Sequence, residues 1–514
     1  MSGSLQLRPV LSTAVLAMLC GCAAPGPPPG RIPLADKAST AERALPQRLP
    51  FSFTRKDTGD SVSPEETEAF TRRLISFCQR SGFFTWILET SHGMDSSANP
   101  NEFMVRWDNF EVIKNGGQVM FRALGHKTPD NIMIPTSKIL GQAAAGYLLT
   151  GDTTLGRIVE QYSLGVCAQF QAMTWDKSDT AGPIMARAVM PANHTVVLPD
   201  GRTKHIDYSP WQRETRAWNT RTFQVPENPF WPGVWVKNMR SKDDLPHLFR
   251  AAVWLAYVTR EAPDERVRDT ASRALACISR FCADIVANRY QIRTRDKKGN
   301  IFIPENDLAS FVAWDAVSPK GECTAKLTVS LLAYGSRLHN RCRTGFGTVY
   351  GTIAPKIHYF NLAIIRGFHM SAILNALITG RSRTARMLTR GLAMRAENVS
   401  LIDGKHYDQD SRQWEADGAV LLLQAATCGL PLTSREVRLI HRMYGEALDT
   451  LEAWPWYDVW DPAVPDGTYP YRPEPIIATE DLGFFLEYCF SPFVNTMGPE
   501  CVDCELLRNG WDRE

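Results

Sequence analysis

The sequence predicts a mainly α-helical fold in which helical hairpins form an inner and an outer layer. Four segments share one plan, in which a strongly apolar helix is followed by a tight polar turn and an amphipathic helix. A helix that is apolar on all sides must be buried, whereas a helix with one apolar stripe can face water. The alternation of the two types along the chain therefore predicts two concentric layers.

The first hairpin shows the plan most clearly. It covers residues 137–170 and turns at 150–153. Apolar residues at helical spacing form a single stripe on its second helix, namely Leu155, Ile158, Val159, Tyr162, Val166 and Phe170. The opposite face of that helix is polar, which is typical of a helix in the outer layer.

Three further hairpins follow the same order. They cover residues 245–282, 361 to beyond 383, and 419–451, with turns at 260–263, 379–382 and 429–431. Single helices are predicted at 65–80, 324–337 and 480–488. Alternating apolar residues over 103–124, with the turn Asn115-Gly116-Gly117 between them, predict one small β-hairpin.

This arrangement resembles the (α/α) toroid, a barrel of helical hairpins. The resemblance covers 64–490, and the phrase Gly146-Tyr147-Leu148-Leu149-Thr150-Gly151-Asp152 is similar to phrases in toroid glycosidases and polysaccharide lyases. It implies a carbohydrate-active enzyme of glycoside hydrolase or polysaccharide lyase type. Helical solenoids also place one helix of each repeat inside and one outside, so an open stack of hairpins is the alternative.

The N-terminus has the anatomy of a secretion signal. Arg8 precedes an apolar stretch of about ten residues, which is too short to span a bilayer. Leu19-Cys20-Gly21-Cys22 resembles a bacterial lipobox, which implies lipidation of Cys22; an ordinary signal with a chance cysteine is the alternative. Because Ala23 follows and no acidic residue stands there, the resemblance implies the outer membrane.

The expected domain organisation follows from these segments. Residues 1–22 are the signal, 23–60 a flexible Pro-rich tether, 61–492 the helical domain and 493–514 a C-terminal tail. A formal net charge of +2 with 22% charged residues gives no reason to expect a nucleic-acid partner. No nucleotide-binding, dinucleotide-binding or zinc-protease motif is present, so no cofactor or metal is expected.

The long connections predict where the site lies. Turns within hairpins are short, whereas the connections over 174–242, 342–356, 400–414 and 454–479 are long. In the predicted plan each long connection runs from an outer helix to the next inner helix, so all of them gather over the N-termini of the inner helices. Loops on a rigid scaffold carry much of protein chemistry, and helix N-termini favour anionic groups.

These loops are rich in carboxylates and aromatic side chains. Glycoside hydrolysis needs one carboxyl to protonate the leaving oxygen and a second to activate water or attack the sugar. The candidate catalytic carboxyls are Asp176, Asp179, Asp315, Glu415 and Asp417. The candidate sugar-stacking residues are Trp175, Trp231, Trp235, Trp414 and Trp456, although most loop aromatics serve as packing anchors. Asp152, in a tight turn, is predicted to be structural.

Two other functions stay open. A lyase would use the pair His358 and Tyr359, with Arg366 neutralising an acidic sugar, as the toroid resemblance implies. A non-catalytic lipoprotein would bind envelope glycan or a partner protein through the same aromatic face. In every case the partners expected are a carbohydrate and, through the lipid, a membrane.

Ten cysteines follow the signal region, and export would permit disulfides. Cys501 and Cys504 in the polar tail are the predicted pair. Cys277 and Cys282 stand five residues apart on one predicted helix, which gives poor bridge geometry. Cysteines inside apolar helical runs are expected to be buried thiols.

Overall fold

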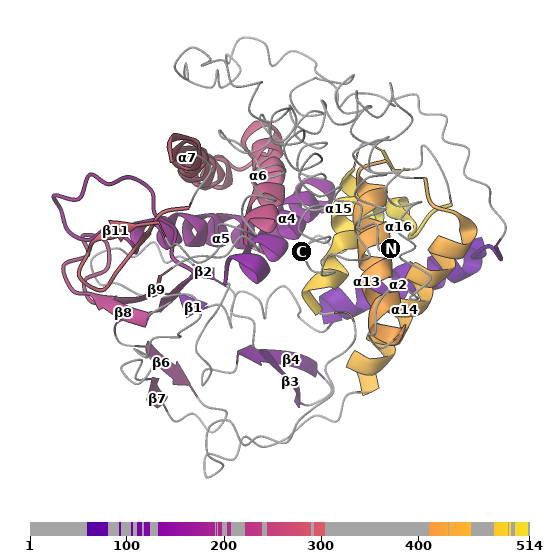
Figure 1. Cartoon of the computed structure of the whole chain (residues 1–514). Coiled ribbons are helices and arrows are strands. Elements are labelled where there is room, and N and C mark those ends of the chain that lie inside the picture. Colours follow the sequence, from indigo (N-terminus) through magenta and orange to yellow (C-terminus); the bar gives the residue numbers. More distant parts are fainter. Residues whose placement is uncertain are drawn as a thin grey trace, which may run out of the picture.

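The computed structural model is mainly helical, with small antiparallel sheets (Figure 1). It describes residues 59–80, 92–93, 104–105, 110–115, 118–123, 132–190, 192, 194–197, 203–206, 222–238, 244–288, 292–303, 411–429, 431–453, 477, 479–491, 493–494 and 499–511. The predictions for the signal, the tether up to residue 58, the third hairpin and the 324–337 helix lie outside these residues.

The first predicted hairpin is confirmed as helices α4 (Met133–Thr150) and α5 (Thr153–Gln171). Gly151 ends α4 in the left-handed conformation, with φ of 73°, and its N–H donates to the carbonyl of Tyr147. The side chain of Asp152 then caps α5 by accepting from the N–H of Leu155 at 2.9 Å. The structural role predicted for Asp152 is therefore confirmed, since its second oxygen also accepts from the indole of Trp511.

The second and fourth hairpins are confirmed as well. The second consists of α6 (Asp244–Glu261) and α7 (Glu265–Ala287). The fourth consists of α13 (Ser411–Thr427) and α14 (Ser434–Ala453), joined through Gly429, whose φ is 90°. Helix α13 begins eight residues before the predicted start, so part of the predicted 400–414 loop is helical.

The first and second hairpins pack against each other. Helix α4 packs against α6, and α5 packs against α7, so apolar helices meet each other and striped helices meet each other. The short 3₁₀ helix η5 (Thr479–Gly483) leads into α15 (Phe484–Phe490), which packs against both α4 and α13. As Figure 1 shows, the C-terminal α15 thus lies beside α4 from the N-terminal half of the chain.

The remaining helices pack against this arrangement. Helix α2 (Pro64–Arg80) contacts α14 and the short α16 (Cys504–Asn509). The segment predicted as a C-terminal tail packs on the helical body, because Cys501, Leu507 and Trp511 belong to its main apolar core. None of the described helices is long and apolar enough to cross a bilayer.

The predicted β-hairpin is confirmed as β3 (Phe110–Asn115) paired with β4 (Gln118–Ala123), with Asn115 opposite Gln118. The structure also contains strands that the sequence did not predict. The antiparallel pairs are β1 (His92–Gly93) with β2 (Met104–Val105), β6 (His194–Val197) with β7 (Thr203–Ile206), and β10 (Thr294–Arg295) with β11 (Ile301–Phe302).

A three-stranded antiparallel sheet lies on the long 174–242 connection. Its strands run in the order β5 (Ala188–Met190), β9 (Val234–Lys237), β8 (Thr222–Val225). Side chains of the sheet form a second apolar cluster with Ile132 before α4 and with Ala168 and Ala172 at the end of α5. This connection therefore covers the N-terminal end of α4, as predicted.

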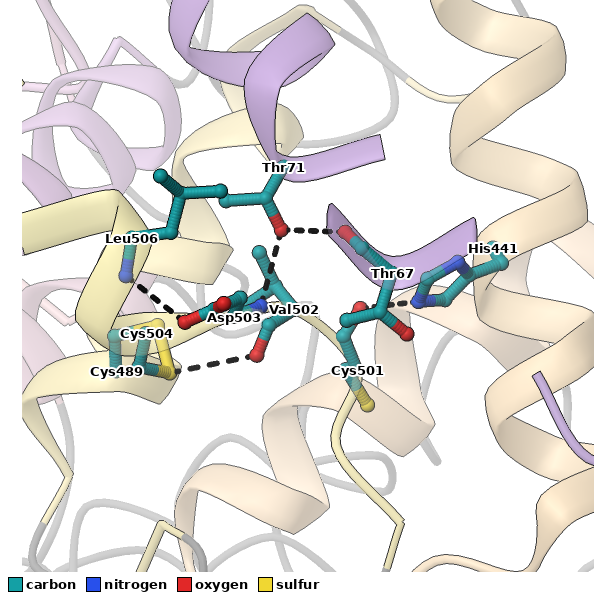
Figure 2. The surroundings of a disulfide bond; sticks show 9 residues. All are labelled: Thr67, Thr71, His441, Cys489, Cys501, Val502, Asp503, Cys504 and Leu506. Atoms are coloured by element: carbon teal, nitrogen blue, oxygen red, sulfur yellow. Dashed lines mark hydrogen bonds between the residues drawn. A yellow bond between two sulfur atoms is a disulfide. The ribbon is translucent and has the colours of Figure 1, made fainter. Parts of the chain in front are cut away.

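The predicted Cys501–Cys504 disulfide is wrong. Cys504 is bonded to Cys489 of α15, and Cys501 is a buried free thiol (Figure 2). The backbone carbonyl of Cys501 accepts a hydrogen bond from Nε2 of His441, whereas the N–H of Asp503 donates to Oγ1 of Thr71 at 3.0 Å. These contacts fix the tail against α14 and α2, and they bring Cys504 to α15 instead of to its sequence neighbour.

We expect the Cys504→Ser substitution to lower the free energy of unfolding by about 3 kcal/mol, because the bond closes a loop of 15 residues. Chemical denaturation with and without a reducing agent measures the effect, and reduction should remove most of the difference between the two proteins. Cys501→Ser is the control, since it leaves the bond in place. If Cys501→Ser also abolished the response to the reducing agent, the pairing would be incorrect.

Candidate active site

Five ionisable side chains meet where the N-terminal halves of α4 and α6 approach η5 and α15. We call them the ionisable cluster: Lys138, His247, Arg250, Asp481 and Glu487. The surroundings are strongly apolar, since most neighbouring residues of these helices belong to the main core. Charged groups in such a place are costly unless they are paired, so their presence calls for an explanation.

The outer part of the cluster is an ion pair near the surface. Nζ of Lys138 lies 3.0 Å from Oδ1 of Asp481, and the two side chains are 17% and 11% exposed. Lys138 lies in the N-terminal half of α4, and Asp481 lies in the middle of η5. Because both side chains are partly exposed, a charged ligand group could reach this pair without unfolding of the helices.

The inner part is a second ion pair that is almost completely buried. Nη2 of Arg250 lies 3.4 Å from Oε1 of Glu487, with side-chain exposures of 2% and 1%. Within the described part of the chain, neither carboxylate oxygen of Glu487 has a hydrogen-bond donor, and Nε of Arg250 has no acceptor. The guanidinium lies over the ring of Phe484, 4.5 Å from its centroid. The two charged groups therefore lie close together, but most of their hydrogen-bonding atoms have no partner.

The carboxyl of Glu487 titrates near neutrality. Burial raises its pKa to about 7, and the nearby Asp481 adds to the increase. The charge of Arg250 and the polar N–H of the nearby Trp254 indole act in the opposite direction. A carboxyl with such a pKa can carry a proton at neutral pH and release it, as a general acid must.

The ring of His247 is neutral at physiological pH. Burial lowers its pKa well below the usual value, and the positive charges of Lys138 and Arg250 lower it further. On the other side of the cluster, burial raises the pKa of Tyr444 well above its usual value, and the carboxylates of Asp481 and Glu487 contribute. The cluster therefore combines two cations and two carboxyls with neutral side chains around them.

Two glycines allow the helices to come this close. A Cβ atom at Gly483 would overlap Oε1 of Gln142 on α4. A Cβ atom at Gly141 would lie 3.1 Å from Oε1 of Glu487 and 3.2 Å from Cδ1 of Trp254. The absence of side chains at these positions brings α15 against α4, which places Glu487 beside α6.

The predicted catalytic residues of the 174–242 connection lie elsewhere and hold a loop. Oδ2 of Asp179 accepts from the N–H of Trp175 at 2.7 Å and from Nη2 of Arg295 at 2.6 Å. Burial alone would raise the pKa of Asp179, but backbone hydrogen bonds from Trp175 and Ala181 and the charge of Arg295 lower it. Oδ1 of Asp176 accepts from both the N–H and the hydroxyl of Ser178, as in an ordinary turn.

The predicted stacking residues of this connection are packed against protein. Trp231 and Trp235 are only 7% and 8% exposed and belong to the second apolar cluster. Trp175 packs on that cluster, and its ring lies 6.4 Å from that of Phe223. These contacts favour the packing role that the sequence left open.

We expect Gly299→Ala to lower the free energy of unfolding by about 2–4 kcal/mol. Gly299 has a φ of 85°, and an added Cβ would lie 2.6 Å from Cε2 of Trp175. Gly151→Ala is the matched control, because its φ is 73° but nothing lies within 4 Å of an added Cβ. Backbone strain alone should cost about 1 kcal/mol there. Equal losses in thermal or chemical denaturation would mean that Trp175 is not held against Gly299.

The other predicted site residues are on α13 or outside the described residues. Oε2 of Glu415 pairs with Nη2 of Arg442 on α14 at 2.9 Å, so it joins two helices of one hairpin. Trp414 and Asp417 also lie on α13, and not in a loop as the sequence predicted. The residues Cys22, Asp315, His358, Tyr359, Arg366 and Trp456, for which the sequence predicts roles, lie outside the described residues.

Sequence reasoning missed the whole ionisable cluster. A signal was present, because Arg250 and Glu487 are charged residues inside otherwise apolar helical segments. No local pattern connects them, since residues 138, 250 and 487 meet only through helix packing. Among the described residues, no group of three or more His, Cys, Asp or Glu side chains is arranged to hold a metal ion.

Comparison with known proteins identifies no family for this chain. The chain matches no protein-family model, no curated protein and no solved structure.

Proposed function

We propose that this protein is a lipid-anchored enzyme of the bacterial cell envelope that hydrolyses a poly- or oligosaccharide. The observation that carries the proposal is the ionisable cluster, in which a carboxyl with a pKa of about 7 lies near a second carboxyl that is ion-paired to a lysine. Glycoside hydrolases need such a division, with one carboxyl protonated and the other ionised.

The proposed fold is an (α/α) toroid. Its support is the contact of inner helices with inner helices, and of outer helices with outer helices. A further support is α15, which contacts both α13 and α4. Contact between the last hairpins and the first is what a closed ring requires, whereas in an open solenoid each repeat contacts only its neighbours along the chain.

In the proposed mechanism Glu487 protonates the leaving glycosidic oxygen, and Asp481 activates water or attacks the sugar. Arg250 positions Glu487, and Lys138 positions Asp481. Because the side chain of Glu487 is 1% exposed, the glycan has to displace side chains that cover it. Lys138 and Arg250 add positive charge beside the N-terminal halves of two helices, which favours glycans with acidic groups.

The proposed location rests on the N-terminal residues. Radiolabelled palmitate should be incorporated by the wild-type protein and not by Cys22→Ala, and the variant should lose its membrane association. A variant that still carried the label and still sedimented with membranes would contradict lipidation at Cys22.

A screen of neutral and acidic envelope polysaccharides tests the activity. New reducing ends without ultraviolet absorbance indicate hydrolysis, whereas absorbance from an unsaturated uronate indicates a lyase. Asp481→Asn should lower the rate by about 10²–10⁴-fold, and Asp176→Asn, in the Trp175 loop, should retain it. The reverse result would move the site to that loop, and binding without any change in glycan length would make the protein a binding module.

A further inference from the structure

Two buried thiols meet between the outer helices of neighbouring hairpins. Sγ of Cys167 on α5 lies 3.5 Å from Sγ of Cys277 on α7, and the residues are 110 positions apart in the sequence. They are 5% and 7% exposed, and both are free thiols in this structure. Neither plays a part in the proposed mechanism.

The surroundings of the pair favour a reactive thiolate at Cys277. Nη2 of Arg280, which lies one helical turn further along α7, is 3.5 Å from its Sγ. The hydrogen bond between the two thiols lowers the pKa of Cys277 and raises that of Cys167, and Arg280 lowers the pKa of Cys277 further. Because the thiolate is the nucleophile in thiol–disulfide exchange, Cys277 is the member of the pair that attacks first.

Another buried cysteine shows the contrast. Cys78 on α2 is 5% exposed, and burial raises its pKa to about 12. A thiol in this state is inert. The short distance between two thiols and the arginine beside one of them therefore distinguish the pair from an ordinary buried cysteine.

We propose that Cys167 and Cys277 form a second disulfide, which links the α4/α5 hairpin to the α6/α7 hairpin, when the protein meets a disulfide oxidant. The Cys277 thiolate attacks one sulfur of the oxidant, forms a mixed disulfide and releases one thiol. The Cys167 thiol then gives up its proton as its sulfur attacks the Cys277 sulfur, and the second thiol is released. Two protein thiols are oxidised, the oxidant disulfide is reduced to two thiols, and both protein protons end on those thiols.

The bond is geometrically within reach. The two sulfur atoms must close from 3.5 Å to the ordinary bond length of about 2.05 Å. The chain already holds the Cys489–Cys504 disulfide. Closing a loop of 110 residues constrains the unfolded chain more strongly than a short loop does, so the bond should raise the melting temperature.

The test uses the full-length protein with oxidised or reduced glutathione. Free thiols are alkylated in denaturant, the protein is digested without reduction, and cross-linked peptides are identified by mass spectrometry. The oxidised wild-type protein and the control Cys78→Ser should both contain the Cys167–Cys277 cross-link. Cys167→Ser and Cys277→Ser should contain only the other disulfides.

Thermal unfolding gives a second readout. Oxidised wild-type protein should melt about 4 °C above oxidised Cys277→Ser, whereas the two reduced proteins should melt within about 1 °C of each other. Full alkylation of Cys167 and Cys277 after oxidation would overturn the proposal, and so would a stalled glutathione adduct or equal melting of the oxidised proteins. The peptide map of the wild-type protein decides the question even if a serine variant does not fold.

Discussion

Replacing Arg250 by methionine is expected to lower the free energy of unfolding by about 3–5 kcal/mol. The substitution keeps much of the side-chain volume but leaves the carboxyl of Glu487 in an apolar core, where it is 1% exposed. The loss of the positive charge should raise the pKa of Glu487 further, because Arg250 lowers this pKa in the wild-type protein. In urea denaturation the cost should therefore grow as the pH rises above 7, because the carboxyl stays protonated in the folded variant and ionises on unfolding.

A second arginine–glutamate pair provides the matched control. Arg442 and Glu415 also join two helices, but their side chains are 47% and 31% exposed. Arg442→Met should therefore cost less than about 1 kcal/mol. The double variant Arg250→Met with Glu487→Leu should recover most of the stability, since no buried charge is left. If Arg250→Met cost no more than Arg442→Met, the inner pair would not be buried as described.

Replacing Glu487 by glutamine is expected to reduce glycan cleavage by about 10²–10⁴-fold, because an amide cannot donate the proton that the leaving oxygen needs. The pH dependence of the wild-type protein provides the internal check. Its kcat/KM should fall as the pH rises through about 7, where the carboxyl of Glu487 loses its proton. Residual activity of the glutamine variant should lack this basic limb.

The same substitution has a predictable effect on stability. The pKa of Glu487 is raised in the folded protein from the ordinary 4.5 to about 7, so the folded state binds the proton more tightly than the unfolded state. The resulting stabilisation is complete below about pH 4.5, and it is lost as the pH rises through 7, a total of roughly 3 kcal/mol. Glu487→Gln should flatten this part of the stability curve, and an unchanged slope would contradict the raised pKa.

The helical hairpins could be predicted because their signals are local. The turn at Gly151 and Asp152 combines a left-handed glycine with a helix cap, and both features are visible in the sequence. The stripe on α5 and the apolar run of α4 likewise specify which helix is inside. The start of α13 could not be predicted, because the mostly polar residues before Ala419 show no apolar residues at helical spacing.

The candidate site could not be predicted because its residues meet only in three dimensions. The sequence predicts that loop carboxylates such as Asp179 are catalytic. In the folded chain, however, Asp179 accepts hydrogen bonds from Arg295 and from backbone N–H groups. Arg250 and Glu487 have no recognisable motif, and only the close approach of α15 to α4 at two glycines brings them together. The predicted Cys501–Cys504 disulfide is wrong for the same reason, since helix packing and not sequence spacing determines the partner of Cys504.

A crystal structure of the Glu487→Gln variant with an uncleaved glycan bound tests the proposed mechanism most directly. The glycosidic oxygen should lie about 3 Å from the amide of residue 487, with Asp481 on the opposite side of the bond to be cleaved. A glycan bound at the loop of Trp175 and Asp176, without contact to α4, α6 or α15, would contradict it.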